Sequence, residues 1–223
     1  MGLSKLREER FSIPKQWRPD TSKFYHPLKR CLDVMVALLA LIIFAPLFLL
    51  VAVCIKLEDP AGPILFKQLR VGENGRTFSM YKFRSMVHNA ESLLDTLISF
   101  NEVSGAMFKM KEDPRITKVG YWIRKTSLDE FPQLINVLKG EMSLVGPRPP
   151  LPREVIIYTD HDIQRLLVRP GCTGIWQVSG RSNLSFEEMV KLDLHYIENR
   201  SILLDFKLIM KTFFVLFGSR DAF

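Results

Sequence analysis

Two neighbouring carboxylates, Asp129 and Glu130, lie in the segment TSLDEFP at residues 126–132. One interpretation is structural, because Ser127 and Glu130 have the spacing of a helix capping box and the helix dipole favours acidic residues in a first turn. Pro132 weakens that interpretation, since at the fifth position of such a helix its ring would clash with the carbonyl of Leu128. The alternative is chemical: one carboxylate attacks a phosphorus atom while the other holds a divalent metal beside the phosphates.

A phosphoryl-transfer site also needs cations to offset the charge of the phosphates. The sequence offers Lys82, Arg84, Arg124, Arg148 and Arg181. Arginine presents a planar fork that fits phosphate oxygens, and the prolines on both sides of Arg148 restrict its backbone. For any one of these residues alone, a solvated surface charge is the simpler interpretation.

The composition limits what kind of protein could hold such a site. The 223 residues suffice for one domain with a core plus appendages, and the net charge of +7 indicates an anionic partner: nucleic acid, an anionic membrane surface or a phosphorylated substrate. Cys31, Cys54 and Cys172 are odd in number and widely spaced, which argues against a disulfide framework or a zinc site. No nucleic-acid-binding motif is recognisable, so a nucleic-acid partner is not expected.

Residues 34–55 are all apolar, about the length that crosses the hydrocarbon core of a bilayer. Pro46 lies near the middle and predicts a kink, which leaves two alternatives: a bent spanning helix, or a re-entrant segment that enters and leaves by one face. Basic residues prefer the cytoplasmic side of a membrane, and Lys29, Arg30 and Lys56 flank both ends, which mildly favours the re-entrant form.

The remaining elements follow from periodicity and turn signals. Apolar-rich runs at 64–71 and 77–83 around Asn74-Gly75 predict a β-hairpin. Helical spacing appears at 91–100 and at 131–138 with Gly140 as the stop, and Ser185 begins a capping box for a helix to about Asn199. Residues 202–217 are rich in Leu, Ile and Phe but carry Asp205, Lys207 and Lys211, which can share one edge of a helix. That pattern fits an interfacial membrane helix, and an ordinary core helix is the alternative.

Four separated motifs resemble those of the bacterial sugar transferases, the monotopic polyprenyl-phosphate phosphoglycosyl transferases. In chain order they are KRCLDVMVALLALIIFAPLFLL, FKQLRVGENGRTFSMYKFRSM, SLDEFPQLINVLKGEMSLVGPRPP and RPGCTGIWQVSGR, the last followed by LDLHYIENRSILLDFKLI. They run from Lys29 to about Lys211. Larger members of this family carry further membrane spans ahead of this unit, so we expect a small member or a part of a larger one.

The resemblance implies an α+β, mainly helical fold. It consists of a re-entrant membrane helix-break-helix at 29–57, with a small β-hairpin and amphipathic interfacial helices around a compact cytoplasmic catalytic domain at 58–217. Residues 1–28 are then a poorly ordered or surface-lying lead-in, and 218–223 a tail. The membrane break falls on Ala45 and Pro46, where small members often have Ser-Pro, whose serine hydroxyl can help to satisfy backbone groups freed by the proline.

The resemblance also implies roles for the candidate residues. Asp129 is the expected covalent nucleophile and Glu130 is associated with Mg²⁺. The arginines Arg124, Arg148 and Arg181 fall on basic positions near the phosphates or the nucleotide, and Lys82 or Arg84 on the basic position of the ribbon.

The implied reaction moves a sugar 1-phosphate from a UDP-sugar to undecaprenyl (polyprenyl) phosphate, with release of UMP, on the cytoplasmic face of a bacterial inner membrane and in contact with membrane lipids. Such a step begins polysaccharide or glycoconjugate synthesis. Two other functions share the same features: a membrane lipid phosphatase or pyrophosphatase, and a non-enzymatic membrane adaptor in which Asp129 only caps a helix. The sugar is not readable from the sequence, and the oligomeric state, a homo-oligomer included, stays open.

Overall fold

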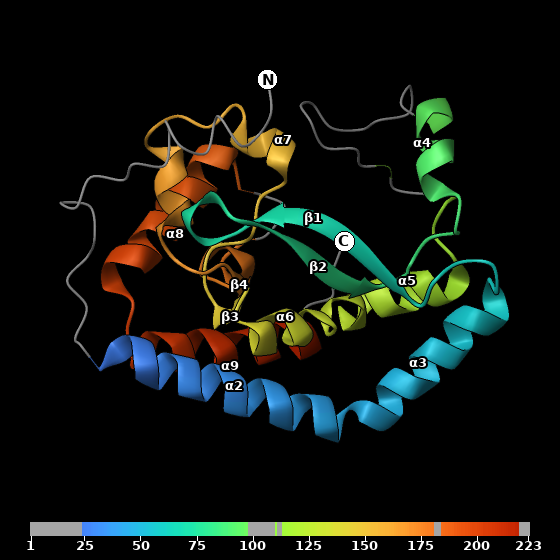
Figure 1. Ribbon diagram of the computed structural model, residues 1–223, viewed down its shortest axis with the longest axis horizontal. Coiled ribbons are helices and arrows are strands. Elements are labelled where there is room, and N and C mark those ends of the chain that lie inside the picture. The colour runs from blue at the N-terminus through green and yellow to red at the C-terminus, as the bar shows by residue number, and fades with distance from the viewer. Residues whose placement is uncertain (1–23, 98–109, 111–112, 181–183, 219–223) are drawn as a thin grey trace.

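The computed structural model describes residues 24–97, 110, 113–180 and 184–218 (Figure 1). Most of the expected lead-in, the end of the helix expected at 91–100, Arg181 and nearly all of the expected tail lie outside these residues. Within them the fold is mainly helical, with two small two-stranded sheets.

Two helices with a sharp bend form one side of the molecule (Figure 1). They are α2 (Tyr25–Ile43) and α3 (Ala45–Glu58), and they meet at 61°. The kink expected from Pro46 is present, because Pro46 occupies the first turn of α3, where its missing N–H costs nothing, and Phe44 carries the break. No single helix among the described residues is long and apolar enough to cross a membrane, whereas α2 and α3 taken together meet the length and composition requirement.

The expected hairpin is confirmed as β1 (Leu65–Val71) and β2 (Thr77–Phe83), which pair antiparallel from Leu65 opposite Phe83 to Val71 opposite Thr77. A short 3-10 turn, η2 (Glu73–Gly75), joins them, and Asn74 and Gly75 have φ of 55° and 72°. These are left-handed values that asparagine and glycine adopt most readily, which is why the Asn-Gly pair marks the turn.

Next along the chain come α4 (Ala90–Leu97), α5 (Lys118–Lys125), the 3-10 turn η4 (Leu128–Glu130) and α6 (Gln133–Lys139). Gly140 ends α6 with φ of 79°, as expected. The bent pair holds both outer ends of this α5–η4–α6 unit. The Glu58 carboxylate accepts from the first backbone N–H groups of α5 at 2.7 and 2.9 Å, and the Arg30 guanidinium donates to the Val137 and Leu138 carbonyls of α6 at 2.6 and 2.9 Å.

A second sheet, parallel, was not predicted. Its strands are β3 (Ser143–Val145) and β4 (Gly171–Thr173). Three residues are too few to show an alternating pattern, and the backbones approach so closely that a Cβ on Gly171 would lie 2.0 Å from the Gly146 nitrogen. Only the folded pairing reveals why both glycines are there.

Short elements complete the middle of the chain: α7 (Pro152–Val155), η5 (Asp162–Leu167) and η6 (Trp176–Val178). The capping box of Ser185 and Glu188 is confirmed at the start of α8 (Phe186–Asn199). The last helix is α9 (Ile202–Gly218), and Figure 1 shows it beside α2. The sequence predicted that Asp205 shares a polar edge of α9 with Lys207 and Lys211. Asp205 is instead buried, and its carboxylate accepts a hydrogen bond from the Lys29 Nζ of α2 at 2.7 Å.

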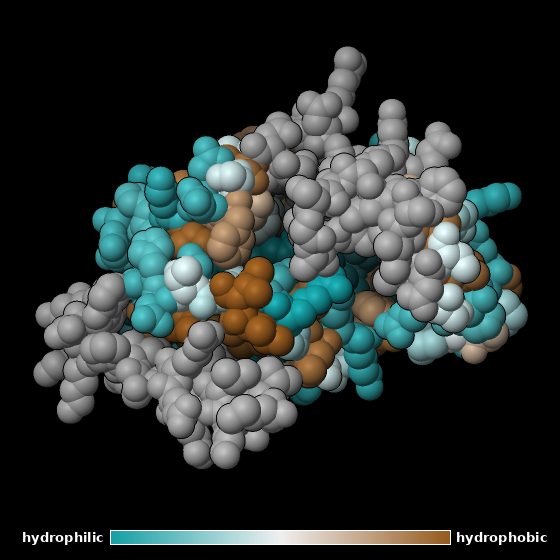
Figure 2. Space-filling view, turned by 90° about the horizontal axis from the view of Figure 1, so that it is seen from above, coloured by the Kyte–Doolittle hydropathy of each residue, from teal (hydrophilic) through white to brown (hydrophobic). Residues whose placement is uncertain are grey.

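Exposed apolar side chains follow the outer faces of the bent pair and of α9. On α2 and α3 they include Met35, Leu39, Ile42, Ile43, Leu49, Leu50 and Val53, and on α9 Leu203, Phe206, Phe213 and Phe214. This excludes an ordinary core helix for α9. The opposite side of the molecule, seen from above in Figure 2, has many hydrophilic side chains with hydrophobic ones among them. Exposed apolar side chains gathered on neighbouring helices are typical of an interaction surface.

Candidate active site

The two carboxylates lie on the turn η4 between α5 and α6. Ser127, which precedes the turn, has φ of 55° and its side chain makes no capping hydrogen bond, so the capping-box interpretation of Ser127 and Glu130 is wrong. α6 begins only after Pro132, which acts as its N-cap and so causes no clash. A serine in the left-handed region costs about 1–3 kcal/mol, and such strain is typical of functional sites. The strained turn is what carries both carboxylates to one place.

Asp129 is buried, with 8% of its surface exposed. Burial raises the pKa of its carboxyl to about 6, and the negative Glu130 adds to that effect while Lys82 and Arg124 oppose it. The Lys82 Nζ lies 3.8 Å from the Asp129 carboxylate, too far for a hydrogen bond. Among the described residues no side chain donates a hydrogen bond to this carboxylate, which leaves its oxygens available to react.

Glu130 differs from its neighbour in both contact and charge. Its carboxylate pairs with the Lys82 Nζ at 2.6 Å, and its side chain is 41% exposed. Loss of water opposes ionisation, but Lys82, then Arg148 and Arg70, lower the pKa of Glu130 below its usual value. At neutral pH Glu130 is therefore ionised, and the buried Asp129 is the more basic of the two carboxylates.

The structure gathers some of the predicted cations and separates others. Lys82 of β2 faces both carboxylates, Arg124 acts on Asp129 from the last turn of α5, and Arg148 acts on Glu130 from the loop after β3. Arg84 instead pairs with Asp59 at 3.3 Å. Of the two ribbon candidates, Lys82 is the one at the carboxylates. Arg181 lies outside the described residues.

Two residues at the site were not predicted. Arg70 of β1 is buried, donates to the Pro149 carbonyl at 2.8 Å and thereby fixes the loop that carries Arg148. The Arg148 guanidinium also lies 5.9 Å from the ring centre of Trp176 on η6. An arginine inside the FKQLRV strand was the available signal for Arg70. Nothing in the local sequence connects Trp176 to a loop some 28 residues earlier.

The break of the bent pair lies beside the carboxylates. Phe131, next to Glu130, contacts Phe44 and Phe48 with ring centres 5.4 and 5.6 Å apart. Phe44, Ala45 and Pro46 are consecutive, so the predicted break residues lie close to η4. The fold brings the apolar helices and the two candidate carboxylates together at one point.

The residues at this site could hold Mg²⁺ only together with phosphate oxygens of a substrate. The described residues contain no group of three or more His, Cys, Asp or Glu side chains that could hold a metal ion by themselves. Mg²⁺ keeps several waters and is commonly held by one or two carboxylates together with substrate phosphates. Ionised, partly exposed Glu130 beside Asp129 meets that smaller requirement.

Comparison with known proteins gives one family. The family described as Bacterial sugar transferase matches residues 24–219. The chain is 48% identical over 194 residues to the galactosyl transferase CpsE of Streptococcus agalactiae, covering 85% of this chain and 42% of that protein. It is 44% identical over 189 residues to the undecaprenyl-phosphate galactose phosphotransferase of Salmonella typhimurium, covering 83% of this chain and 39% of that protein.

A shorter relative is matched along most of its length. The exopolysaccharide production protein ExoY of Sinorhizobium fredii is 42% identical over 199 residues, which cover 87% of this chain and 88% of that protein. The chain thus spans about two-fifths of CpsE and of the Salmonella protein, and nearly all of ExoY.

Proposed function

This chain belongs to the bacterial sugar transferase family, and from that premise we propose that it transfers a sugar 1-phosphate from a UDP-sugar to undecaprenyl phosphate, releasing UMP. The observation that carries the proposal is the difference between the surroundings of the two carboxylates on η4. Asp129 is buried and has no hydrogen-bonding side-chain partner among the described residues, whereas Glu130 forms the ion pair with Lys82. A helix cap or a structural ion pair would show the opposite arrangement for Asp129.

In the first step a carboxylate oxygen of Asp129 attacks the sugar-linked phosphorus of the donor. The new O–P bond forms as the bond from phosphorus to the bridging oxygen breaks, and UMP leaves with that electron pair. The pKa of about 6 leaves Asp129 ionised at neutral pH yet more basic than an ordinary aspartate, which favours nucleophilic attack. The product is a phosphosugar on Asp129.

In the second step an oxygen of the undecaprenyl phosphate attacks the same phosphorus. The bond from phosphorus to Asp129 breaks, the carboxylate is restored and the polyprenyl diphosphate-sugar leaves. Lys82 lies between the two carboxylates and offsets charge at the phosphorus in both steps, while Arg148, braced by Arg70 and Trp176, is placed to bind the departing phosphate.

We assign Glu130, together with the substrate phosphates, as the holder of Mg²⁺. When bound, the ion would neutralise negative charge on the diphosphate and so favour its cleavage. The lowered pKa of Glu130 supports this role, because it favours the ionised carboxylate that a cation binds.

We further propose that α2 and α3 enter and leave the bilayer by its cytoplasmic face. Their exposed apolar faces, the 61° bend and the contact of Phe44 and Phe48 with Phe131 support this placement. An acceptor with a long prenyl tail keeps that tail in the lipid, so its phosphate must be met at the membrane surface. The break would place Asp129 at that surface.

The test measures UMP release by the full chain in detergent with Mg²⁺ and undecaprenyl phosphate, from UDP-galactose, UDP-glucose and UDP-N-acetylgalactosamine in turn. Asp160→Asn is the matched control, because Asp160 is exposed and lies outside η4 and the cations around it. Wild type and control should release UMP, and Asp129→Asn should not. Phosphate release without any donor would indicate a lipid phosphatase instead, and an active Asp129→Asn protein would refute the nucleophile.

The covalent step is tested separately by isotope exchange. Labelled UMP should enter the UDP-sugar pool without any lipid acceptor, because the first half-reaction is reversible on its own. Exchange that requires the acceptor would contradict the aspartyl intermediate while leaving sugar-phosphate transfer itself standing.

A further inference from the structure

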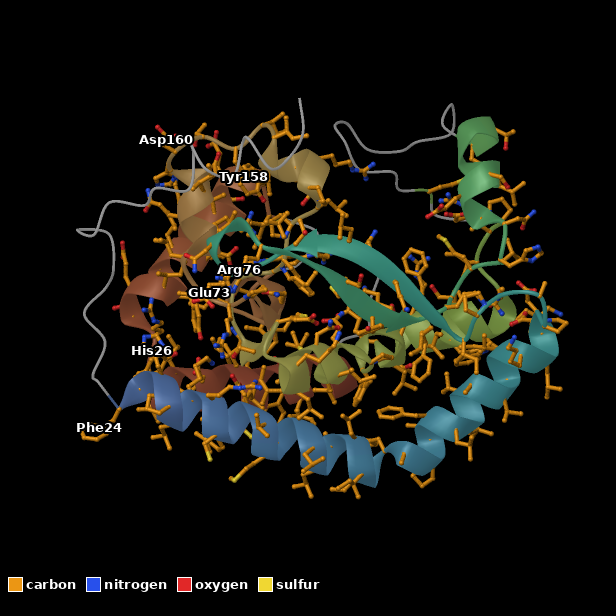
Figure 3. The ribbon with its side chains drawn as sticks, in the orientation of Figure 1. Phe24, His26, Glu73, Arg76, Tyr158 and Asp160 are labelled. Carbon is orange, nitrogen blue, oxygen red and sulfur yellow. The ribbon has the colours of Figure 1, made fainter. Side chains whose placement is uncertain are left out.

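A pocket separate from the catalytic turn opens at the other end of α2. Residues of the first turns of α2 line it, together with Glu73 at the tip of the β-ribbon, Arg169 after η5 and the end of α8. Figure 3 shows His26 at this end of α2, on the side of the molecule where the ribbon tip with Glu73 lies. Lys29 and Phe44, the residue that ends α2, are fifteen residues apart, which places the pocket roughly 22 Å from the break beside Asp129 and Glu130.

Two of the cations in this pocket are already committed to the fold. Lys29 pairs with the Asp205 carboxylate at 2.7 Å, and Tyr196 donates to the other oxygen of Asp205 at the same distance. Arg30 donates hydrogen bonds to the carbonyls at the end of α6. Asp33 is committed as well, since it accepts from the Leu144 backbone at 3.1 Å. These groups shape the pocket but are not free to take a ligand.

Arg169 and Arg200 are different. The only carboxylate within ion-pair distance of Arg169 in the described structure is Glu73, at 3.4 Å, and both side chains of that pair are about two-fifths exposed. An ion pair that is this exposed to water is weak. Arg200 donates one N–H to the Ile197 carbonyl at 2.8 Å, but its Nε is buried with no hydrogen-bond partner and no carboxylate within the described residues pairs with it.

The local charge is positive as a result. The pKa of His26 lies below its usual value, first because burial removes water and then because Arg200, Arg169 and Lys29 repel a second positive charge, with only Glu73 acting the other way. An anionic oxygen in the pocket would offset this excess charge and accept charge-assisted hydrogen bonds from the guanidinium groups.

The outer face of the same turns is apolar. Phe24 and Leu28 are 79% and 48% exposed, whereas Tyr25 is buried and Lys29 faces the pocket. A ligand with its anionic group between Arg169 and Arg200 could therefore lay hydrocarbon along α2. This combination selects a molecule with a phosphate and acyl chains over a free phosphate ion.

We propose that this pocket binds the phosphate of an anionic membrane phospholipid through Arg169 and Arg200, at a site distinct from that of the catalytic acceptor. The inference rests on the proposed contact of α2 with the bilayer but not on the proposed chemistry. Lipid held there would fix the depth of the N-terminal end of α2, while the active site lies at its other end.

The test is native mass spectrometry of the delipidated full chain in neutral detergent, titrated with phosphatidylglycerol. Arg169→Gln/Arg200→Gln is compared with Arg76→Gln/Lys191→Gln, which removes the same charge from exposed positions outside the pocket. Wild type and the control should retain one lipid, and the pocket variant should bind it at least about tenfold more weakly, the loss of one charge-assisted hydrogen bond. Equal weakening in both variants, or in neither, would overturn the site.

A competition experiment and a single-substitution variant complete the test. Inorganic phosphate is titrated against the protein with phosphatidylglycerol bound, and if it displaces the lipid at equal concentration the site is a phosphate site and the lipid assignment is wrong. Arg169→Gln alone serves if the double variant does not fold, since among the described residues its exposed side chain forms an ion pair with Glu73 alone. An unchanged affinity in that variant would refute its role. Binding is measured without turnover, so a failed lipid site and a failed transferase activity give separate results.

Discussion

Asp129 and Asp193 are two buried aspartates whose pKa values are both raised to about 6 by burial, yet their surroundings are opposite. Asp193 of α8 accepts from the Arg165 Nε at 2.8 Å and pairs with its Nη2 at 2.6 Å, and both side chains are almost fully buried. Asp129 has its nearest cation, Lys82, at 3.8 Å, and that cation is bonded to Glu130.

A displaced pKa does not by itself mark a reactive group. What separates the two sites is the cation: Arg165 has Asp193 as its counter-charge, whereas Lys82 retains Glu130 if Asp129 is removed. Arg165 thus depends on Asp193 for its counter-charge, whereas no cation among the described residues depends on Asp129 alone.

Asp129→Asn should lower UMP release by about 10³-fold or more, because an amide cannot form the proposed intermediate. The assay is steady-state turnover with saturating donor and acceptor. Asp193→Asn, tested beside it, should keep the specific activity of wild type in its folded fraction. If Asp193→Asn lost activity without losing structure, the distinction between the two aspartates would fail.

Asp193→Asn should instead lower the free energy of unfolding by about 3–5 kcal/mol, because it leaves the buried Arg165 guanidinium without a counter-charge. Denaturant titration in a fixed detergent, followed by tryptophan fluorescence, measures this change. Asp160→Asn is again the exposed control. A variant as stable as wild type would show that the buried pair contributes nothing to the fold.

Lys82→Met should reduce turnover by about 10²-fold, as for the loss of one preorganised charge at a reacting phosphate. Because Lys82 lowers the pKa of Asp129, its removal should also move the acidic limb of the pH profile to higher pH. Arg84→Met is the matched control on the same ribbon, where the cation pairs with Asp59. Equal effects of the two substitutions would contradict the choice of Lys82.

The pH dependence follows from the raised pKa of Asp129. The carboxylate is the attacking form, so kcat/KM for the donor should be level above about pH 6 and fall about tenfold per unit below it. Rate measurements from pH 5 to 8 in one buffer series would show this limb. A profile that stays flat down to pH 5 would mean that Asp129 is not the group whose ionisation limits the reaction.

The smallest expected effect is on the free energy of unfolding, and its sign for Asp129→Asn is opposite to that for Asp193→Asn. A carboxyl whose folded-state pKa is raised contributes stability at low pH that is lost as the pH rises through about 6. Asn at position 129 has no charge to bury, so Asp129→Asn should be more stable than wild type by about 1–2 kcal/mol at pH 7.5, with the gap closing near pH 4. A destabilised Asp129→Asn protein would place this aspartate with Asp193 as a structural residue.

Local chemistry in the sequence was sufficient for many elements. The Asn-Gly turn, the break at Pro46, the glycine stop of α6 and the Ser185 capping box each depend on residues within a few positions of one another, and the structure has all four. Motif resemblance, not spacing, led to the family, which the comparisons show. The membrane placement and the roles of the site residues stay predictions.

Tertiary structure decided what depends on distant partners. Only the fold shows that Ser127 makes no cap, that Lys82 and not Arg84 faces the carboxylates, and that Asp205 turns inward to Lys29. The β3–β4 pair and the bracing of Arg148 join segments far apart in the chain. The physical reason is common to all of them: burial and charge pairing are set by neighbours in space, whereas a sequence reports only neighbours along the chain.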